Sequence, residues 1–473
     1  QYAILQKYRK NYAEAIELAE KQFSSQKLTQ TGILLHRYYA SFVHNKGLKI
    51  FNEWANKNPG PRTRLYLADA HRLEKDYATA DSYYAALLQD SSKTISPVPV
   101  YLAYSKSKIE QNQSDSSKYY MVQAIEAIDS DIDAEIYFEN IKYILTDNEY
   151  KGYLELPDIP ARVDFFKRVW IKRNPMPASE VNYRIIEHVR RFAYAERNFF
   201  YDGFRLPFNN PDRLNILQFP LVFDLNDLFN DKGLVYIRHG EADDRAFAIN
   251  SGPLNESWLY YARGQLNQKL IFHFWQGDTQ TGQNWRMVAS IPSSLAESRS
   301  NFDHLYSRLM MADPLEAISI RHQMEIASKE YVRIGMNSDQ HTWKKDLRSI
   351  IFPFYLATFR QDHVSTRSEF YFSLTKNDVL HRSAKHKIDD SVTINFAVFD
   401  DNYTKLDKQL LQVPIREIVD SSAAMGYWPG QIDYISPPAA RLFAINIRTP
   451  DDEGIGGYKF RFNLGGYDED SLK

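Results

Sequence analysis

The chain has 473 residues, of which 58 are lysine or arginine and 60 are aspartate or glutamate, so the formal net charge is −2. This balance leaves no overall field to attract nucleic acid or an anionic lipid surface. A mean hydropathy of −0.50, with no apolar run near the roughly 18 residues of a spanning helix, argues against an integral membrane protein.

Cysteine is absent, which excludes disulfides, thiolate metal sites and a cysteine nucleophile. A chain of this length predicts two to four domains rather than one core. It starts at Gln1, so an upstream signal peptide or lipid anchor is compatible with it, and we expect export to the periplasm or outer membrane. We expect no cofactor and no metal.

Residues 1–148 are predicted to be helices joined by short polar turns. Four segments share a polar pair, a turn residue and a helix with small or apolar positions four apart, such as Ala15 and Ala19. The equivalent positions in the four segments are Tyr12, Gly47, Tyr77 and Ser114. Their spacing is close to the ~34-residue period of tetratricopeptide (TPR) repeats. The region resembles a degenerate TPR array, whose stacked pairs expose a groove for partners. A plain helical spacer is the alternative.

Residues 149–291 are predicted to form an α+β domain that begins with two amphipathic helices. The first helix has an apolar stripe of Val163, Phe166, Val169 and Trp170, and the second one of Ile185, Ile186, Val189, Phe192 and Ala193. Short strands are then predicted at Leu234–Ile237, around Trp258, at 269–275 and from Asn284. No helix is expected between these strands.

The tetrapeptide Arg238-His239-Gly240-Glu241 resembles the signature of the histidine phosphatases. That chemistry needs a histidine nucleophile, arginines that hold the phosphate, and a second histidine. The predicted strands lack the helix-strand alternation of that superfamily, and no later histidine follows a glycine. We therefore favour a strand end with a turn at Gly240, and keep a phosphohydrolase centred on His239 as the alternative.

Four segments, in order, resemble the GWxTD domain, a family of unknown function in exported proteins of Bacteroidetes. They are "FFKRVWIKRNPMP" from Phe165, "RRFAYAERNFF" from Arg190, "KGLVYIRHGEADD" from Lys232 and "ESWLYY" from Glu256. The eponymous motif itself is replaced by "FNDKG" at 229–233. We interpret the arginines as partners of nearby glutamates and aromatic rings. The candidate interaction or structural ion network comprises Arg238, His239, Glu241, Asp243, Arg190 and Arg191.

Residues 292–345 are predicted to be bridging helices. Their apolar residues recur at three- and four-residue steps: Leu305, Leu309, Ile318, Met324, Ile326 and Tyr331. Residues 346–473 alternate with period two, as in Val392, Ile394 and Phe396, and predict an antiparallel β-sandwich of immunoglobulin-like class. Turns are expected at 400–402 and at Gly456-Gly457.

The leading hypothesis is thus a multidomain α+β protein that acts by contact. We expect a non-enzymatic scaffold subunit of a bacterial cell-envelope assembly, such as outer-membrane protein assembly or secretion machinery. Its partners would be other envelope proteins in a membrane-associated complex, without nucleic acid and without a transmembrane helix in this chain. A glycan-binding accessory protein, which needs an exposed aromatic platform such as Tyr427-Trp428, is a further alternative beside the phosphohydrolase.

Overall fold

The computed structural model divides into two compact units. Unit 1 comprises Gln1–Phe165 and Ile186–Thr342, and unit 2 comprises Phe166–Ile185 and Trp343–Lys473. The described residues are 2–90, 95–179, 181–203, 217–226, 228–248, 254–262, 268–276, 284–341, 348–380, 390–451 and 453–465. Within them the protein is mixed α+β, with three open sheets.

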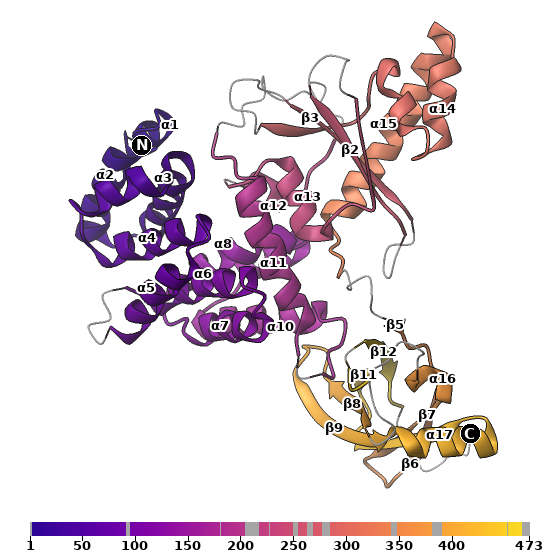
Figure 1. Cartoon of the computed structure of the whole chain (residues 1–473). Helices are drawn as coiled ribbons and strands as arrows, with labels where there is room; N and C mark the ends of the chain where they lie inside the picture. Colours follow the sequence, from indigo (N-terminus) through magenta and orange to yellow (C-terminus); the bar gives the residue numbers. More distant parts are fainter. Residues whose placement is uncertain are drawn as a thin grey trace. The chain divides into compact units, whose positions relative to one another are not determined.

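The first part of unit 1 is helical, and each helix from α1 to α7 packs on the next (Figure 1). Its elements are α1 (Tyr2–Tyr8), α2 (Tyr12–Gln26), α3 (Thr29–Ala55), α4 (Pro61–Leu73), α5 (Tyr77–Gln89), α6 (Pro97–Glu110), α7 (Ser114–Glu126), α8 (Asp131–Ile141), η1 (Lys142–Ile144) and α9 (Asp147–Leu154). Aromatic and small side chains from α2 to α6 form one core, in which Leu35, Ala80 and Tyr84 are fully buried.

Three turns of this region repeat one backbone conformation. A residue with positive φ lies two positions before the next helix at Lys10 (59°), Lys75 (66°) and Asn112 (62°). At Lys75 the N–H of Lys75 donates to the Arg72 carbonyl and that of Asp76 to the His71 carbonyl, both at 2.9 Å, which is a common helix ending. The other two turns make the same two bonds. The repeat spacing therefore predicts where α2, α5 and α7 begin, while the TPR assignment stays a prediction.

The remaining predicted repeat position, Gly47, is a break within a helix. Gly47 lies inside α3 with a φ of 73° and a ψ of 172°, which is not helical, so two helices meet there without a loop between them. Positive φ is a conformation that glycine adopts without the penalty that a Cβ imposes.

The second part of unit 1 combines helices with a four-stranded sheet. Its elements are α11 (Tyr183–Asn198), which enters unit 1 at Ile186, α12 (Leu221–Asp224), α13 (Asp231–His239), β1 (Asp244–Phe247), β2 (Asn255–Tyr260), β3 (Leu270–Gln276), β4 (Trp285–Val288), η3 (Ser293–Leu295), η4 (Glu297–Arg299), α14 (His304–Met311) and α15 (Pro314–Met336). The sheet is an antiparallel meander in the order β1-β2-β3-β4. Helix α15 packs against β3.

The prediction of a strand at Leu234–Ile237 is wrong, because this segment lies in α13. Leu234, Val235 and Ile237 are all at most 2% exposed. An apolar run that is buried on more than one side carries no clear period, so it does not distinguish a strand from a helix. The other three predicted strands correspond to β2, β3 and β4.

Unit 2 contains two sheets. Besides the later part of α10 (Ile159–Arg173), it comprises β5 (Arg348–Ser349), β6 (Phe354–Arg360), β7 (Thr366–Leu374), α16 (Lys376–Val379), β8 (Ser391–Phe399), β9 (Lys405–Pro414), α17 (Ile415–Met425), β10 (Trp428–Ser436), β11 (Ala440–Arg448) and β12 (Gly454–Asn463). The sheet orders are β10-β7-β6 and β5-β12-β11-β8-β9. The Phe370 ring of the first sheet lies 4.7 Å from both Phe396 and Phe443 of the second, so the two sheets share one core.

The prediction of a turn at Gly456-Gly457 is also wrong, since both residues lie within β12. A Cβ at Gly456 would be 2.2 Å from the carbonyl oxygen of Ile350, and one at Gly457 would be 2.3 Å from the amide of Asn446. Glycine is needed at these two positions because Ile350 and Asn446 approach the backbone of β12 closely, and not because the chain turns there.

Candidate functional site

His239, the residue at the centre of the predicted motif, is the last residue of α13. Its side chain is 1% exposed, and its Nε2–H donates to the carbonyl of Gly335 at 2.7 Å. Burial lowers the pKa of His239 to about 3; Gly335 opposes this shift, and the charges of Arg238 and Arg191 add to it. The imidazole is therefore neutral near pH 7 and serves as a buried hydrogen-bond donor.

Two buried guanidinium groups lie beside this histidine. Arg191 forms an ion pair with Glu187 at 2.8 Å, and it donates to the carbonyl oxygens of Arg238 at 2.6 Å and Gln340 at 2.7 Å. Arg238 donates to the carbonyl oxygen of Leu145 at 2.6 Å. Both side chains thus bind main-chain carbonyls of segments far apart in the sequence. Three predicted site residues meet here: Arg191, Arg238 and His239.

The turn after α13 is shaped by one of these arginines. Gly240 has a φ of 79°, and a Cβ there would lie 3.0 Å from the guanidinium of Arg191. Glycine is therefore required at this position both for its backbone conformation and for the approach of Arg191. Backbone conformation and packing against Arg191 therefore explain the glycine at position 240 of the phosphatase-like tetrapeptide.

The remaining predicted site residues lie at the surface. The side chain of Arg190 is 47% exposed and pairs with a glutamate one turn earlier in α11. The side chain of Glu241 is 79% exposed and lies 3.9 Å from Arg245, and Asp243 accepts the N–H of Tyr261 at 2.8 Å. The structure does not place these three in the buried group.

A larger buried set of charges, the α11 ion-pair cluster, was not predicted as a whole. It consists of Asp69, Arg72, Lys106, Glu110, Glu196 and Arg197. Glu196 of α11 accepts from Arg72 of α4 at 2.6 Å and from Lys106 of α6 at 2.8 Å. Arg197 pairs with Glu110 at the end of α6 at 2.7 Å. Within unit 1, α11 therefore lies against the helical region (Figure 1).

The charges of this cluster compensate one another. Burial alone would raise the pKa of Glu196, but Lys106 and Arg72 hold it well below its usual value. Burial would likewise lower the pKa of Arg72, yet Glu196, Asp69 and Glu110 hold it well above the usual value. Arg72 is completely buried, so these carboxylates replace the hydration that its guanidinium group loses.

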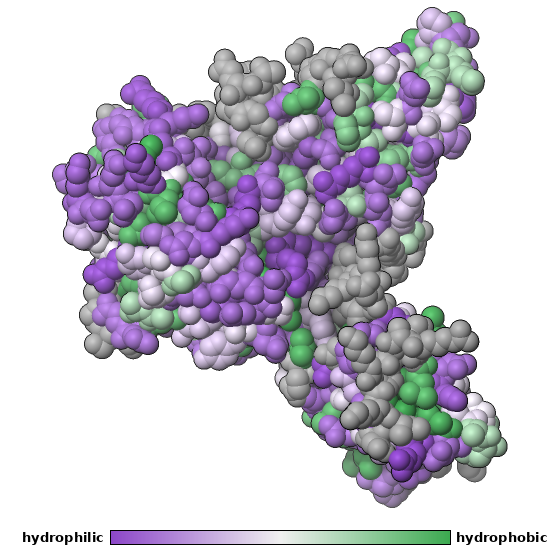
Figure 2. Space-filling view, viewed as in Figure 1, coloured by the Kyte–Doolittle hydropathy of each residue, from purple (hydrophilic) through white to green (hydrophobic). Residues whose placement is uncertain are grey.

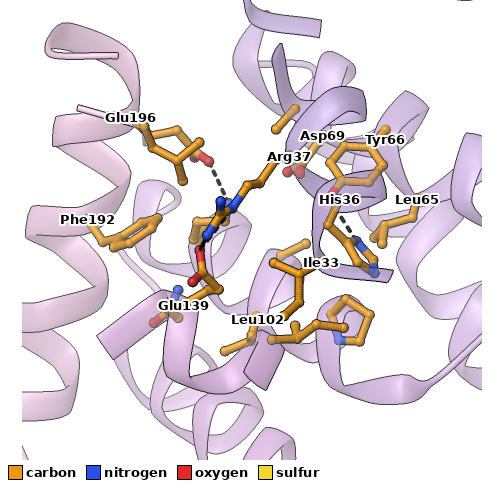
Figure 3. Close-up of a pocket in the computed structure, with 17 residues that line it drawn as sticks. Ile33, His36, Arg37, Leu65, Tyr66, Asp69, Leu102, Glu139, Phe192 and Glu196 are labelled. Atoms are coloured by element: carbon orange, nitrogen blue, oxygen red, sulfur yellow. Dashed lines mark hydrogen bonds and ion pairs between the residues drawn. The ribbon is translucent and has the colours of Figure 1, made fainter. Parts of the chain in front are cut away.

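A small cavity borders the cluster (Figure 3). Its volume is 130 Å³, below the roughly 300–1,000 Å³ of typical ligand pockets. Figure 3 shows Arg37 and Glu139 pointing toward each other at 2.9 Å and His36 facing the Tyr66 hydroxyl at 3.0 Å. Burial, with a contribution from Arg62, lowers the pKa of His36 to about 3. The lining of this cavity is mostly apolar, with residues such as Leu65, Leu102 and Phe192, and its volume is too small for a typical substrate.

Helices α14 and α15 carry a second kind of feature, an exposed apolar surface. We define the α14–α15 stripe as Met311, Leu315, Ile318 and Ile326, which are 91%, 80%, 59% and 56% exposed. The space-filling view shows pale green, apolar surface around the α14 end of this hairpin (Figure 2). Ile318 and Ile326 belong to the periodic apolar set of these helices, yet both are exposed. The buried face of α15 is formed instead by Ala317, Ile320 and Met324.

The predicted aromatic platform does not form at Tyr427-Trp428. Tyr427 is 47% exposed, but Trp428 is 9% exposed and its indole N–H donates to Glu417 at 2.8 Å. Among the described residues, no group of three or more His, Asp or Glu side chains is placed to hold a metal ion. In the same residues, no helix has the length and apolar character needed to cross a membrane.

Helical spacing is consistent with the pairing of Arg191 with Glu187, but it gives no sign of the partners of Glu196 and Arg197. Arg72 precedes Glu196 by 124 residues and Lys106 precedes it by 90, so no local spacing connects them. Neither a scan against protein-family models nor a search of curated proteins finds a match for this chain.

Proposed function

We propose that this protein is a non-enzymatic scaffold subunit of a bacterial cell-envelope assembly, and that it binds other envelope proteins. The proposal includes a TPR-like region at 1–148, a GWxTD-like domain at 149–291, bridging helices at 292–345 and an immunoglobulin-like sandwich at 346–473. The resemblance of four ordered segments to GWxTD domains supports an exported protein. Outer-membrane protein assembly or secretion is the process that we consider most suitable.

The observation that carries this proposal is the α14–α15 stripe. A surface helix normally has one apolar stripe, which faces the core. Helix α15 has that stripe and a second one, with Leu315, Ile318 and Ile326 three or eight residues apart on one exposed side. Exposed apolar side chains that gather on one side of a helix are candidates for contact with a protein or a membrane. An apolar groove or amphipathic helix of a partner fits residues spaced in this way.

The buried groups around His239 support contact rather than turnover. The Nε2–H of His239 and the guanidinium groups of Arg191 and Arg238 bind main-chain carbonyl oxygens. In a phosphoryl-transfer site such groups would face the substrate oxygens. We therefore rank the scaffold role above a phosphohydrolase.

The test is affinity purification of the tagged protein from its native envelope, followed by quantitative mass spectrometry. We expect stoichiometric recovery of envelope proteins with the wild type and their loss from a Leu315→Gln/Ile318→Gln variant. A Leu28→Gln/Ile50→Gln variant is the matched control, because these side chains are 48% and 49% exposed on other parts of unit 1. Recovery of the wild type as a lone monomer would contradict the proposal, as would equal recovery of partners with both variants.

A further inference from the structure

A second concave feature of unit 1 is a groove along α2. Its volume is 620 Å³, within the roughly 300–1,000 Å³ of ligand pockets. One wall is the first half of α2, and the other is Trp54 of α3 with the segment 58–63 that leads into α4. Ile16, Tyr39 and Thr63 are at most 5% exposed and form its floor.

The groove carries an excess of negative charge. Its charged residues are Glu14, Glu17, Glu20 and Arg62, so its formal charge is three negative against one positive. Arg62 is committed to Glu20 at 2.8 Å. Glu14 accepts from the amide of Asn11 at 2.6 Å, and in the described chain neither Glu14 nor Glu17 has a lysine or arginine at ion-pair distance. Two carboxylates therefore remain for a cation.

The opposite wall suits the same ligand. Trp54 packs against Tyr39, Phe42 and Phe51 but is only partly buried, and the exposed part of a tryptophan ring attracts a cation. The amides of Asn11 and Asn58 lie on the rim; their nitrogens donate to Glu14 and to the Trp54 carbonyl, and their oxygens can accept from an extended main chain. An anionic ligand would meet the carboxylates at a cost, because like charges repel.

We propose that this groove binds a basic segment of a partner polypeptide, with a lysine or arginine side chain held between Trp54 and the carboxylates of Glu14 and Glu17. Charge complementarity selects a cationic segment, and the aromatic wall favours a side chain with an apolar stem. The groove is separate from the α14–α15 stripe and would act whether or not that stripe binds a partner.

The experiment uses the full chain and a fluorescein-labelled peptide of alternating glycine and lysine, with a glycine-glutamate peptide as the comparison, in fluorescence anisotropy titrations. We expect the lysine peptide alone to bind. A Glu14→Gln/Glu17→Gln variant should weaken binding about tenfold or more, because charge-assisted hydrogen bonds are lost. Glu53→Gln, an exposed glutamate of α3 outside the groove, should leave binding unchanged.

A second variant, Trp54→Phe, tests the other wall and should also weaken binding, with far-UV circular dichroism confirming that it folds. The Leu315→Gln/Ile318→Gln variant should bind the lysine peptide as the wild type does, which separates this inference from the proposed scaffold contact. Equal affinity for both peptides, or equal loss with Glu53→Gln and Glu14→Gln/Glu17→Gln, would overturn the assignment.

Discussion

The α11 ion-pair cluster of unit 1 and the core between the two sheets of unit 2 bury different chemistry. In unit 1, the α11 ion-pair cluster places Arg72, Lys106 and Glu196 in the interior, with Arg72 completely buried. In unit 2, the core between the sheets is apolar, and Val392, Ile394 and Phe396 are all fully buried. Apolar burial is tolerant of its exact partners, whereas a buried charge is stable only beside a specific opposite charge. Beside its own apolar core, unit 1 therefore depends on particular ion pairs, whereas the core between the two sheets of unit 2 depends on an apolar pattern.

The largest effect should follow from removing one charge of the cluster. Glu196→Ala leaves Arg72 and Lys106 without their shared carboxylate, and should lower the free energy of unfolding of unit 1 by about 3–5 kcal/mol. Denaturant unfolding monitored by hydrogen exchange would measure this change for each unit. The exposed Glu53→Ala should change it by less than about 0.5 kcal/mol. A small effect of Glu196→Ala would mean that the buried charges are not what holds α11.

A smaller effect should appear as a pH dependence of unit 1. The pKa of His239 is about 3 in the folded chain and 6.5 as its ordinary value. Between these values the unfolded chain binds a proton that the folded chain does not, so stability is full above 6.5 and falls as the pH is lowered. The slope is up to about 1.4 kcal/mol per pH unit for one histidine.

His239→Gln, which keeps an N–H donor for Gly335, should make this slope shallower. The measurement is the free energy of unfolding of unit 1 at several pH values from about 7 to 5, the range in which histidine ordinarily titrates. His322→Gln, whose side chain is 72% exposed, is the control and should leave the slope unchanged. Identical slopes for wild type and His239→Gln would show that His239 does not titrate as a buried group.

In unit 2 the corresponding test removes a single methylene group from the apolar core. Ile394→Val should destabilise unit 2 by about 0.5–1.5 kcal/mol, because the removed group leaves a small cavity in the core. Ile435→Val, at a position 52% exposed in β10, should have almost no effect. Equal effects of the two changes would indicate that the apolar core is less tightly packed than its burial suggests.

The smallest effect on stability should come from the α14–α15 stripe. Leu315→Gln/Ile318→Gln alters side chains that contact solvent, so the free energy of unfolding should change by no more than about 0.5 kcal/mol per site. The same denaturant experiment measures this change. A large loss of stability would mean that the stripe packs within this chain, and would remove it as a partner site.

The sequence predicted those elements whose period is visible on one face. In β7, β8 and β11 the residues of the shared apolar core lie at alternate positions, and the turns before Tyr12, Tyr77 and Ser114 recur with the repeat. It did not predict α13, where buried residues follow one another without a period. It also could not assign Ile318 and Ile326 to solvent, since an apolar residue at helical spacing looks the same on either face.

By itself, the sequence determined the order of helices and strands over most of the chain and the buried stripes of the α10–α11 pair, because these depend on neighbours within a few residues. Tertiary structure alone decided that Glu196 meets Arg72 and Lys106, that His239 donates to Gly335, and which side of α15 is exposed. Each of these contacts joins positions that are distant in the chain, and the free energy of a buried charge or hydrogen bond depends on partners that only the folded chain brings within reach.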